Sequence, residues 1–249
     1  MPNWTDPGDY AYTDDLDGSG WAWEFLRRNH RYCRDWRTFM QTWRALEADY
    51  GQAPNRDFAR WKLDPRANLF EPPREADETV TAWTERTGND CVAIECAFGA
   101  RWGLYKFPPD PERTAPELGD ALCFREYPEV AKIITPDSSY LGQNSAQIAL
   151  GFDLDRPLKS QLDEARRFLI ARQHHLRRDS GLTLRTVATQ KASWRLGLRL
   201  LDALEADAKA GTIAQTLFDG DRDRYTDQLH QALALHDDAY RALPGLPVK

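Results

Sequence analysis

The chain ends in a series of helix-forming runs separated by glycine turns, and this pattern restricts the fold more than any other feature of the sequence. Between Arg195 and Leu246 it predicts a long helix, a short helix and a second long helix. The first helix is expected to end at Gly211, Thr212 to cap the short helix, and Gly220 to supply the second turn. A packed short helix, a turn and a helix with a polar first turn occur in that order in helix-turn-helix DNA-binding modules, although ordinary helical bundles share the pattern.

The charge distribution favours an acidic partner for the region around the start of this pattern. The chain of 249 residues has a net charge of −6, yet residues 156–199 hold 11 Lys and Arg against 3 Asp and Glu. Lys191, Arg195 and Arg199, here called the basic stripe, lie four residues apart on one helical face, where like charges repel unless an anion meets them. We expect the basic stripe to face DNA phosphates. The alternatives are a solvated face or an intramolecular partner in the acidic arm of residues 1–18.

Two groups of side chains are candidates for DNA contacts. The first group would bind phosphates and supply non-specific affinity. Its members are Arg166, Arg167, Arg177, Arg178, Arg185, Lys191, Arg195 and Arg199. The backbone N–H of Thr212 would meet a further phosphate at a helix N-terminus. The second group would read base edges from the first turns after Gly220, and its members are Arg222, Arg224, Thr226 and Gln228.

The C-terminal segment 152–246 resembles the DNA-binding domain of RovC-like transcription factors, which are linked to type VI secretion. The resemblance is carried by residues 155–162 (DRPLKSQL), 195–204 (RLGLRLLDAL), 211–218 (GTIAQTLF) and 238–243 (DAYRAL). The aromatic segment 21–29 (WAWEFLRRN), with Tyr32 and Trp36, resembles the small helical domain that accompanies it in many proteobacterial proteins.

This resemblance implies a sequence-specific transcriptional regulator, an activator of secretion-system or related genes. Its partner would be double-stranded promoter DNA, and it would act as a homo-oligomer, from a dimer up to a hexamer. The sequence departs from the family in one respect, because several aspartates stand in a helical region that is basic in the family. They are Asp219, Asp221, Asp223 and Asp227.

The remaining sequence predicts an α+β fold. From Trp21 to Tyr50, large apolar side chains recur along one helical face that suits a core or a subunit interface. A hairpin is expected from Val92–Phe98 and Trp102–Phe107, and a helix after Pro157. Further strands are expected at Leu122–Phe124, Val130–Thr135 and Gln147–Leu154. Residues 1–150 should therefore form an oligomerisation domain of aromatic helices packed with a small antiparallel sheet, and residues 151–249 an all-helical, helix-turn-helix-like DNA-binding domain.

The sequence contains none of the catalytic or cofactor motifs that we sought. No GxSxG, HExxH or Walker phosphate loop occurs. The pairs Asp163-Glu164 and Asp237-Asp238 would point about 100° apart on a helix, which suits acid–base catalysis poorly. The four cysteines do not form CxxC pairs, and His174-His175 lacks a third ligand, so no metal site is predicted. We therefore expect no enzymatic activity, no metal and no cofactor.

No run of residues has the length and apolarity of a membrane span, and the N-terminus does not read as a signal peptide, so we expect a cytoplasmic protein. The alternative function is a protein–protein interaction or scaffolding module that does not bind DNA. Its interface would be the aromatic helices and the acidic N-terminal half.

Overall fold

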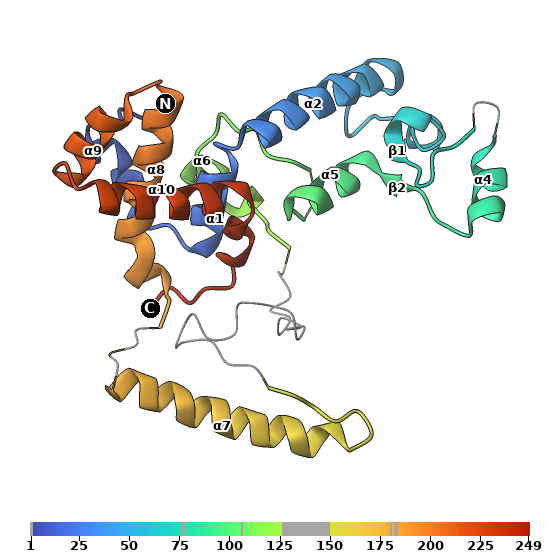
Figure 1. The fold of residues 1–249 in the computed structure, drawn as a ribbon. Helices are drawn as coiled ribbons and strands as arrows, with labels where there is room; N and C mark the ends of the chain where they lie inside the picture. The colour runs from blue at the N-terminus through green and yellow to red at the C-terminus, as the bar shows by residue number, and fades with distance from the viewer. Residues whose placement is uncertain (1, 76–77, 106, 126–149, 180, 182–183) are drawn as a thin grey trace. The chain divides into compact units, whose positions relative to one another are not determined.

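A computed structural model describes residues 2–75, 78–105, 107–125, 150–179, 181 and 184–249 of the protein (Figure 1). The chain divides into two compact units, residues 1–127 with 186–249 and residues 128–185. The first unit contains both ends of the chain. The helix described in the second unit is α7 (Leu158–Asp179). The predicted functional division at residue 150 stays a prediction.

Helices dominate the first unit. Its α-helices are α1 (Gly18–Leu26), α2 (His30–Tyr50), α3 (Phe58–Trp61), α4 (Val80–Thr87), α5 (Ile94–Trp102), α6 (Ala115–Leu118), α8 (Val187–Glu205), α9 (Ala210–Phe218) and α10 (Arg222–Asp237). Its 3-10 helices are η1 (Pro7–Thr13), η2 (Pro65–Ala67), η3 (Gly119–Ala121) and η4 (Ala239–Ala242). Strand β1 (Asn68–Leu69) pairs antiparallel with β2 (Val92–Ala93). The predicted α+β class, with a small antiparallel sheet and a helical C-terminal region, is confirmed.

The core of the first unit is built around α1. Trp21, Trp23, Phe25 and Leu26 are fully buried, and α1 packs against α6, α8, α10 and η4. The Trp21 ring lies 5.4 Å from the ring of Trp194 on α8. The aromatic N-terminal segment therefore shares one hydrophobic core with the C-terminal helices, a pairing of distant segments that helical periodicity alone does not indicate.

Helix α2 extends the aromatic face away from this core. Asn29 caps it by accepting a hydrogen bond from the backbone N–H of Arg31 at 2.9 Å. Tyr32, Phe39 and Leu46 are buried along one side of the helix. In the distal half of α2, Leu46 packs with Trp61 of α3 and Ala67 of η2 in a separate apolar cluster. Trp43 and Tyr50 of α2 lie at the edge of this cluster. Large apolar residues thus occupy one side of α2.

The predicted hairpin at residues 92–107 is wrong. Val92 and Ala93 are extended, but they pair with β1, and the following residues form α5. Phe98 and Trp102 stand one helical turn apart, and both rings contact Tyr32, at 5.8 and 5.5 Å. Because a helix presents both rings to the same neighbour, tertiary packing overrides the β preference of the local sequence.

None of the other three predicted strands forms a regular strand within its described residues. The segment Leu122–Phe124 contributes a single bridge, between Leu104 and Phe124. The segment Val130–Thr135 and the first three residues of Gln147–Leu154 lie outside the described residues. Residues 150–154 are irregular. None of the helices in the described ranges has the length and apolarity needed to cross a membrane.

Candidate nucleic-acid interface

The three C-terminal helices follow one another in the predicted order, a long helix, a short helix and a second long helix. Ile213 and Phe218 of α9 are buried against Leu200 and Ala203 of α8. The Tyr225 ring of α10 packs on Phe218 with ring centroids 5.8 Å apart. Helices α8 and α9 therefore both pack against α10 (Figure 1). This is the support that a recognition helix needs.

The turn between α9 and α10 is fixed by local interactions. Asp219 and Gly220 both have positive φ, at 54° and 82°, and the first of these ends α9. The side chain of Asp221 then caps α10 by accepting hydrogen bonds from the backbone N–H groups of Asp223 and Arg224, at 3.1 and 3.0 Å. Two of the unexpected aspartates therefore act in the turn itself.

The first of the predicted helix boundaries is wrong. Helix α8 ends at Glu205 instead of Gly211, and Asp207, with φ at 53°, makes part of the turn that was assigned to glycine. Lys209 occupies the N-cap position of α9. Thr212 consequently lies inside the first turn of α9 and does not cap it. Its backbone N–H still belongs to the N-terminal turn, where helices bind anions.

The predicted base-reading residues separate into two groups. Arg222 and Arg224 are exposed in the first turn of α10, and neither makes an ion pair within the described part of the chain. Thr226 is exposed, and its hydroxyl donates to the Arg222 carbonyl at 2.9 Å. Gln228, in contrast, is turned towards α8. Its amide donates to the Ser193 carbonyl at 3.0 Å and accepts from the Ser193 hydroxyl at 3.1 Å.

The acidic arm binds two members of the basic stripe. Arg195 Nε donates to Thr13 Oγ1 at 3.0 Å, and its Nη2 pairs with Asp14. Arg199 donates to the carbonyl oxygens of Trp4 and Thr5, at 2.8 and 3.1 Å. The structure therefore places an intramolecular partner on this stripe, one of the alternatives that the sequence left open.

The electrostatics agree with this contact. The Arg195 guanidinium lowers the pKa of the Asp14 carboxyl by a hydrogen bond and by its charge, and Lys191 adds a smaller effect. Lys191 makes no ion pair in the part of the chain that the structure describes. It is therefore the member of the basic stripe whose ammonium group is not bound by the acidic arm.

The remaining predicted phosphate contacts belong to the second unit. They are Arg166, Arg167, Arg177, Arg178 and Arg185, and all are exposed. On α7, Arg178 pairs with Asp179 at 2.9 Å, and Arg167 donates to the Asp163 carbonyl at 3.3 Å. Arg166 and Arg177 make no ion pair with any described residue. Four of these five cations therefore lie on α7.

A buried ionic network that sequence reasoning missed joins α1 to α8. Arg28 binds Asp202 through two hydrogen bonds, of 2.7 and 3.0 Å, and Glu24 at 2.7 Å. Tyr10 and Tyr12 donate to Asp202 and Glu24, both at 2.6 Å. Burial would raise the pKa of Glu24, but Arg28 and Arg27, together with hydrogen bonds from Tyr12 and the Ala115 backbone, lower it below its ordinary value. Every charge in the network has a partner, which is typical of a structural core.

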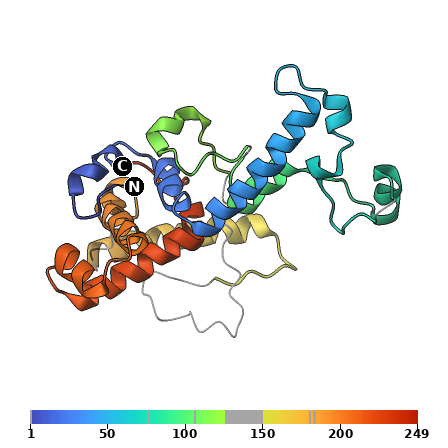
Figure 2. The same ribbon diagram turned by 90° about the horizontal axis from the view of Figure 1, so that it is seen from above.

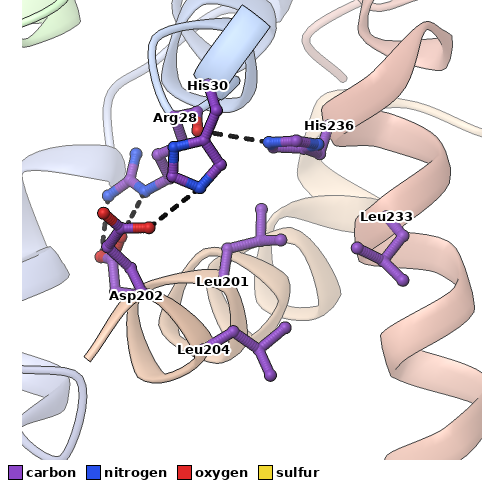
Figure 3. A pocket seen from close by; sticks show the side chains of 8 residues that line it. Arg28, His30, Leu201, Asp202, Leu204, Leu233 and His236 are labelled. Atoms are coloured by element: carbon purple, nitrogen blue, oxygen red, sulfur yellow. Dashed lines mark hydrogen bonds and ion pairs between the residues drawn. The ribbon is translucent and has the colours of Figure 1, made fainter. Parts of the chain in front are cut away.

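A small cavity lies beside this network. It measures about 180 Å³ and is lined by Arg28 before α2, by His30 at the start of α2, and by residues of α8 and α10, among them Leu201, Leu233 and His236. Figure 3 shows His30 turned towards the end of α8, where it pairs with Glu205 at 3.0 Å. Because ligand pockets usually measure roughly 300–1,000 Å³, this cavity is too small for most organic ligands.

Comparison with known proteins supports a regulatory role for the N-terminal part. Residues 3–64 match the family described as the proteobacterial transcriptional regulator-like domain. This range includes residues 3–18 of the acidic arm, α1, α2 and α3, and it contains the aromatic segment that was expected to resemble such a domain. No curated protein and no solved structure matches the chain. The RovC-like resemblance of the C-terminal segment stays a prediction.

Proposed function

We propose that this protein is a transcriptional regulator that binds double-stranded DNA through α9, the turn at Gly220 and α10. One observation supports this proposal above the others. Arg222 and Arg224 stand exposed, without an internal ion pair among the described residues, in the first turn of a helix that packed neighbours hold in place. Arginine side chains at that position suit bidentate hydrogen bonds to guanine in the major groove. The similarity of residues 3–64 to regulators supports the same role independently.

Phosphate contacts would come from cations whose side chains are not bound by the acidic arm. We assign them to Lys191 and to the exposed arginines of α7, with the N-terminal turn of α9 offering backbone N–H groups around Thr212. Arg195 and Arg199 would bind phosphate only if their hydrogen bonds to the acidic arm were broken. Six phosphate contacts would give log K against log salt a slope of roughly −5.

The finer parts of the proposal follow from the resemblance and from geometry. A single helix-turn-helix module binds weakly, and regulators usually place two modules in successive major grooves. We therefore propose a cytoplasmic homo-oligomer, from a dimer up to a hexamer, that activates secretion-system or related genes. We propose no enzymatic activity, because the one strongly buried cluster of ionisable groups described in the first unit is satisfied internally.

Selection of genomic DNA fragments by the purified full chain tests this function. Fragments recovered by the wild type would be titrated by fluorescence anisotropy at several salt concentrations. We expect Arg222→Ala with Arg224→Ala to lower affinity for selected fragments at least tenfold and to weaken the preference over random DNA. The matched control is Gln231→Ala, an exposed residue further along α10.

Two results would contradict the DNA-binding part of the proposal. A salt slope near zero would exclude a DNA-backbone interface. Unchanged fragment preference in the double arginine variant would exclude α10 as the reading helix. A protein that self-associates but retains no DNA would instead support the scaffolding alternative. Light scattering that finds a monomer at micromolar concentration would contradict the homo-oligomer.

A further inference from the structure

One side of α2 carries a row of exposed arginines. Arg31, Arg34, Arg37 and Arg44, here called the arginine face, are all exposed. They follow one another at steps of three and seven residues, which place them along one side of the helix. None of them makes an ion pair or a side-chain hydrogen bond with the residues that the structure describes. The buried aromatic side of α2 lies on Tyr32, Phe39 and Leu46 instead.

The carboxylates of α2 are already neutralised by arginines from other elements. Asp35 pairs with Arg101 at 3.2 Å. Glu47 pairs with Arg56 at 3.1 Å. Asp49 pairs with Arg66 at 2.6 Å. The four cations of the arginine face are therefore left without compensation by their own helix.

The acidic side chain at the end of α8 does not fill this gap. Glu205 approaches the N-terminal end of α2, but it pairs with His30 at 3.0 Å. Like charges three residues apart on a helix repel each other weakly, and a bound anion removes that penalty. A guanidinium fork also matches the oxygen geometry of phosphate. An uncompensated row of arginines in a chain with a net charge of −6 therefore points to a polyanionic partner.

The position of α2 beside α10 favours DNA as the polyanion. Asn29, the cap of α2, donates its side-chain amide to the His236 carbonyl at 2.8 Å, near the end of α10. The His236 ring in turn lies 3.2 Å from the Arg28 carbonyl. Figure 2 shows α2 following α10 almost end to end. The arginine face thus begins where the proposed recognition helix ends.

We propose that the arginine face binds DNA phosphates outside the bases read by α10. The proposal rests on the proposed DNA-binding function and extends its contact surface. Thirteen residues of helix separate Arg31 from Arg44, a rise of about 20 Å, which equals about six nucleotides of one strand. The contact carries no sequence information, so it adds affinity and not base preference.

The test compares two triple variants of the full chain at the same positions. Arg34→Gln, Arg37→Gln and Arg44→Gln remove the charge, whereas Arg34→Lys, Arg37→Lys and Arg44→Lys keep it. Both are titrated against salt on a selected fragment and on a shorter duplex trimmed to the bases whose identity the selection fixes. Circular dichroism checks that both variants fold.

We expect the glutamine variant to have a salt slope less steep by roughly 3 and to bind the long fragment at least tenfold more weakly. Its base preference and its affinity for the short duplex should match the wild type. The lysine variant should retain most of the slope, because phosphate contacts depend mainly on charge.

The outcomes separate the two proposals. If the wild type shows no salt-dependent DNA binding, the DNA-binding function itself fails. If the wild type binds DNA and the glutamine variant has the same slope and affinity, only the role of the arginine face is overturned. Retention of the wild type on immobilised polyglutamate, lost in the glutamine variant while DNA binding is unchanged, would assign the face to an acidic protein segment and overturn the proposal.

Discussion

Arg28 and Asp202 form a bidentate ion pair in the interior of the first unit, although 174 residues separate them in the chain. Arg28 belongs to the segment that matches the regulator-like domain, and Asp202 belongs to α8, which supports the proposed reading helix. Tyr10 adds a hydrogen bond to the same carboxylate at 2.6 Å. This network and the aromatic core around it connect the N-terminal domain to the C-terminal helices.

The first prediction concerns the stability that depends on this pair. Asp202→Ala leaves the buried Arg28 to share Glu24 with Arg27, and a buried charge that loses its own partner is costly. We expect the free energy of unfolding in urea to fall by about 3 kcal/mol. Asp227→Ala, at an exposed position of α10, is the control and should change it little. Joint replacement, Arg28→Met with Asp202→Leu, should cost less than Asp202→Ala, and the opposite order would contradict this account.

A second prediction concerns acid stability at Asp64. Arg66 donates hydrogen bonds to this nearly buried carboxylate from its side chain and its backbone, and with Tyr50 it lowers the pKa of Asp64 to about 2. The pKa of an Asp carboxyl in an unfolded chain is about 3.9. Because the folded pKa is the lower one, the contribution is complete above about pH 4 and is lost as the pH falls towards 2.

Asp64→Asn isolates this contribution. The variant should lose at most about 2 kcal/mol relative to the wild type at pH 5, because Arg66 is partly exposed and screened. The difference between the two proteins should shrink as the pH is lowered to 3. Urea unfolding at both values measures it. A difference that is constant with pH would show that Asp64 stabilises the fold without titrating.

The third prediction concerns Gln228, which the sequence places among the base-reading residues. Its side chain bonds both the carbonyl and the hydroxyl of Ser193. We therefore expect Gln228→Ala to lower the free energy of unfolding by about 1–2 kcal/mol while the preference for selected DNA is unchanged. Arg224→Ala should have the reverse pattern. If Gln228→Ala folded stably but lost its base preference, Gln228 would be a base-reading residue and this account would be wrong.

The helical order of the C-terminal region could be predicted because its signals are local. Apolar periodicity marks α8, α9 and α10, and Gly220 marks the turn before α10. The boundary before α9 was missed because Asp207, and not the expected glycine, adopts positive φ and bends the chain there. The helix α5 was missed because packing of Phe98 and Trp102 on Tyr32 decides its conformation.

The site was predicted less well, because it depends on contacts between distant segments. Sequence spacing places Arg195 and Arg199 on one helical face, but it does not reveal that Thr13, Asp14 and the Trp4 carbonyl meet them. The same limit explains why the network of Arg28 was missed. The arginine face of α2 could have been found from sequence, since its spacing is regular, but only the structure shows that the neighbouring carboxylates are paired.

A fourth prediction tests the contact between the acidic arm and the basic stripe. Asp14→Asn removes the carboxylate that pairs with Arg195, so that phosphate can take its place on that guanidinium, which keeps its hydrogen bond to Thr13. We expect DNA affinity to rise and the salt slope to become steeper by about 1. Asp15→Asn, one residue along, makes the same charge change at an exposed side chain. Equal effects of the two variants would show that net charge alone is responsible.

The last prediction contrasts two helical glycines. At Gly18, a Cβ atom would lie 2.0 Å from the Leu243 carbonyl oxygen, so the first turn of α1 touches the backbone after η4. At Gly197, in the middle of α8, a Cβ atom would lie 3.4 Å from the Cβ of Ala232 on α10, an ordinary contact. Gly18→Ala should therefore destabilise the protein by about 1–3 kcal/mol, because backbone must move.

Gly197→Ala should be neutral or stabilise the fold by up to about 1 kcal/mol, since alanine favours the helix and the space accepts a methyl group. Urea unfolding of the two variants measures both effects. Gly197→Leu extends the series. Its larger side chain would push α8 away from α10, so this variant should be less stable to urea than Gly197→Ala. If Gly197→Ala destabilised the protein and Gly18→Ala did not, the spacing described between α8 and α10, and that between α1 and Leu243, would both be contradicted.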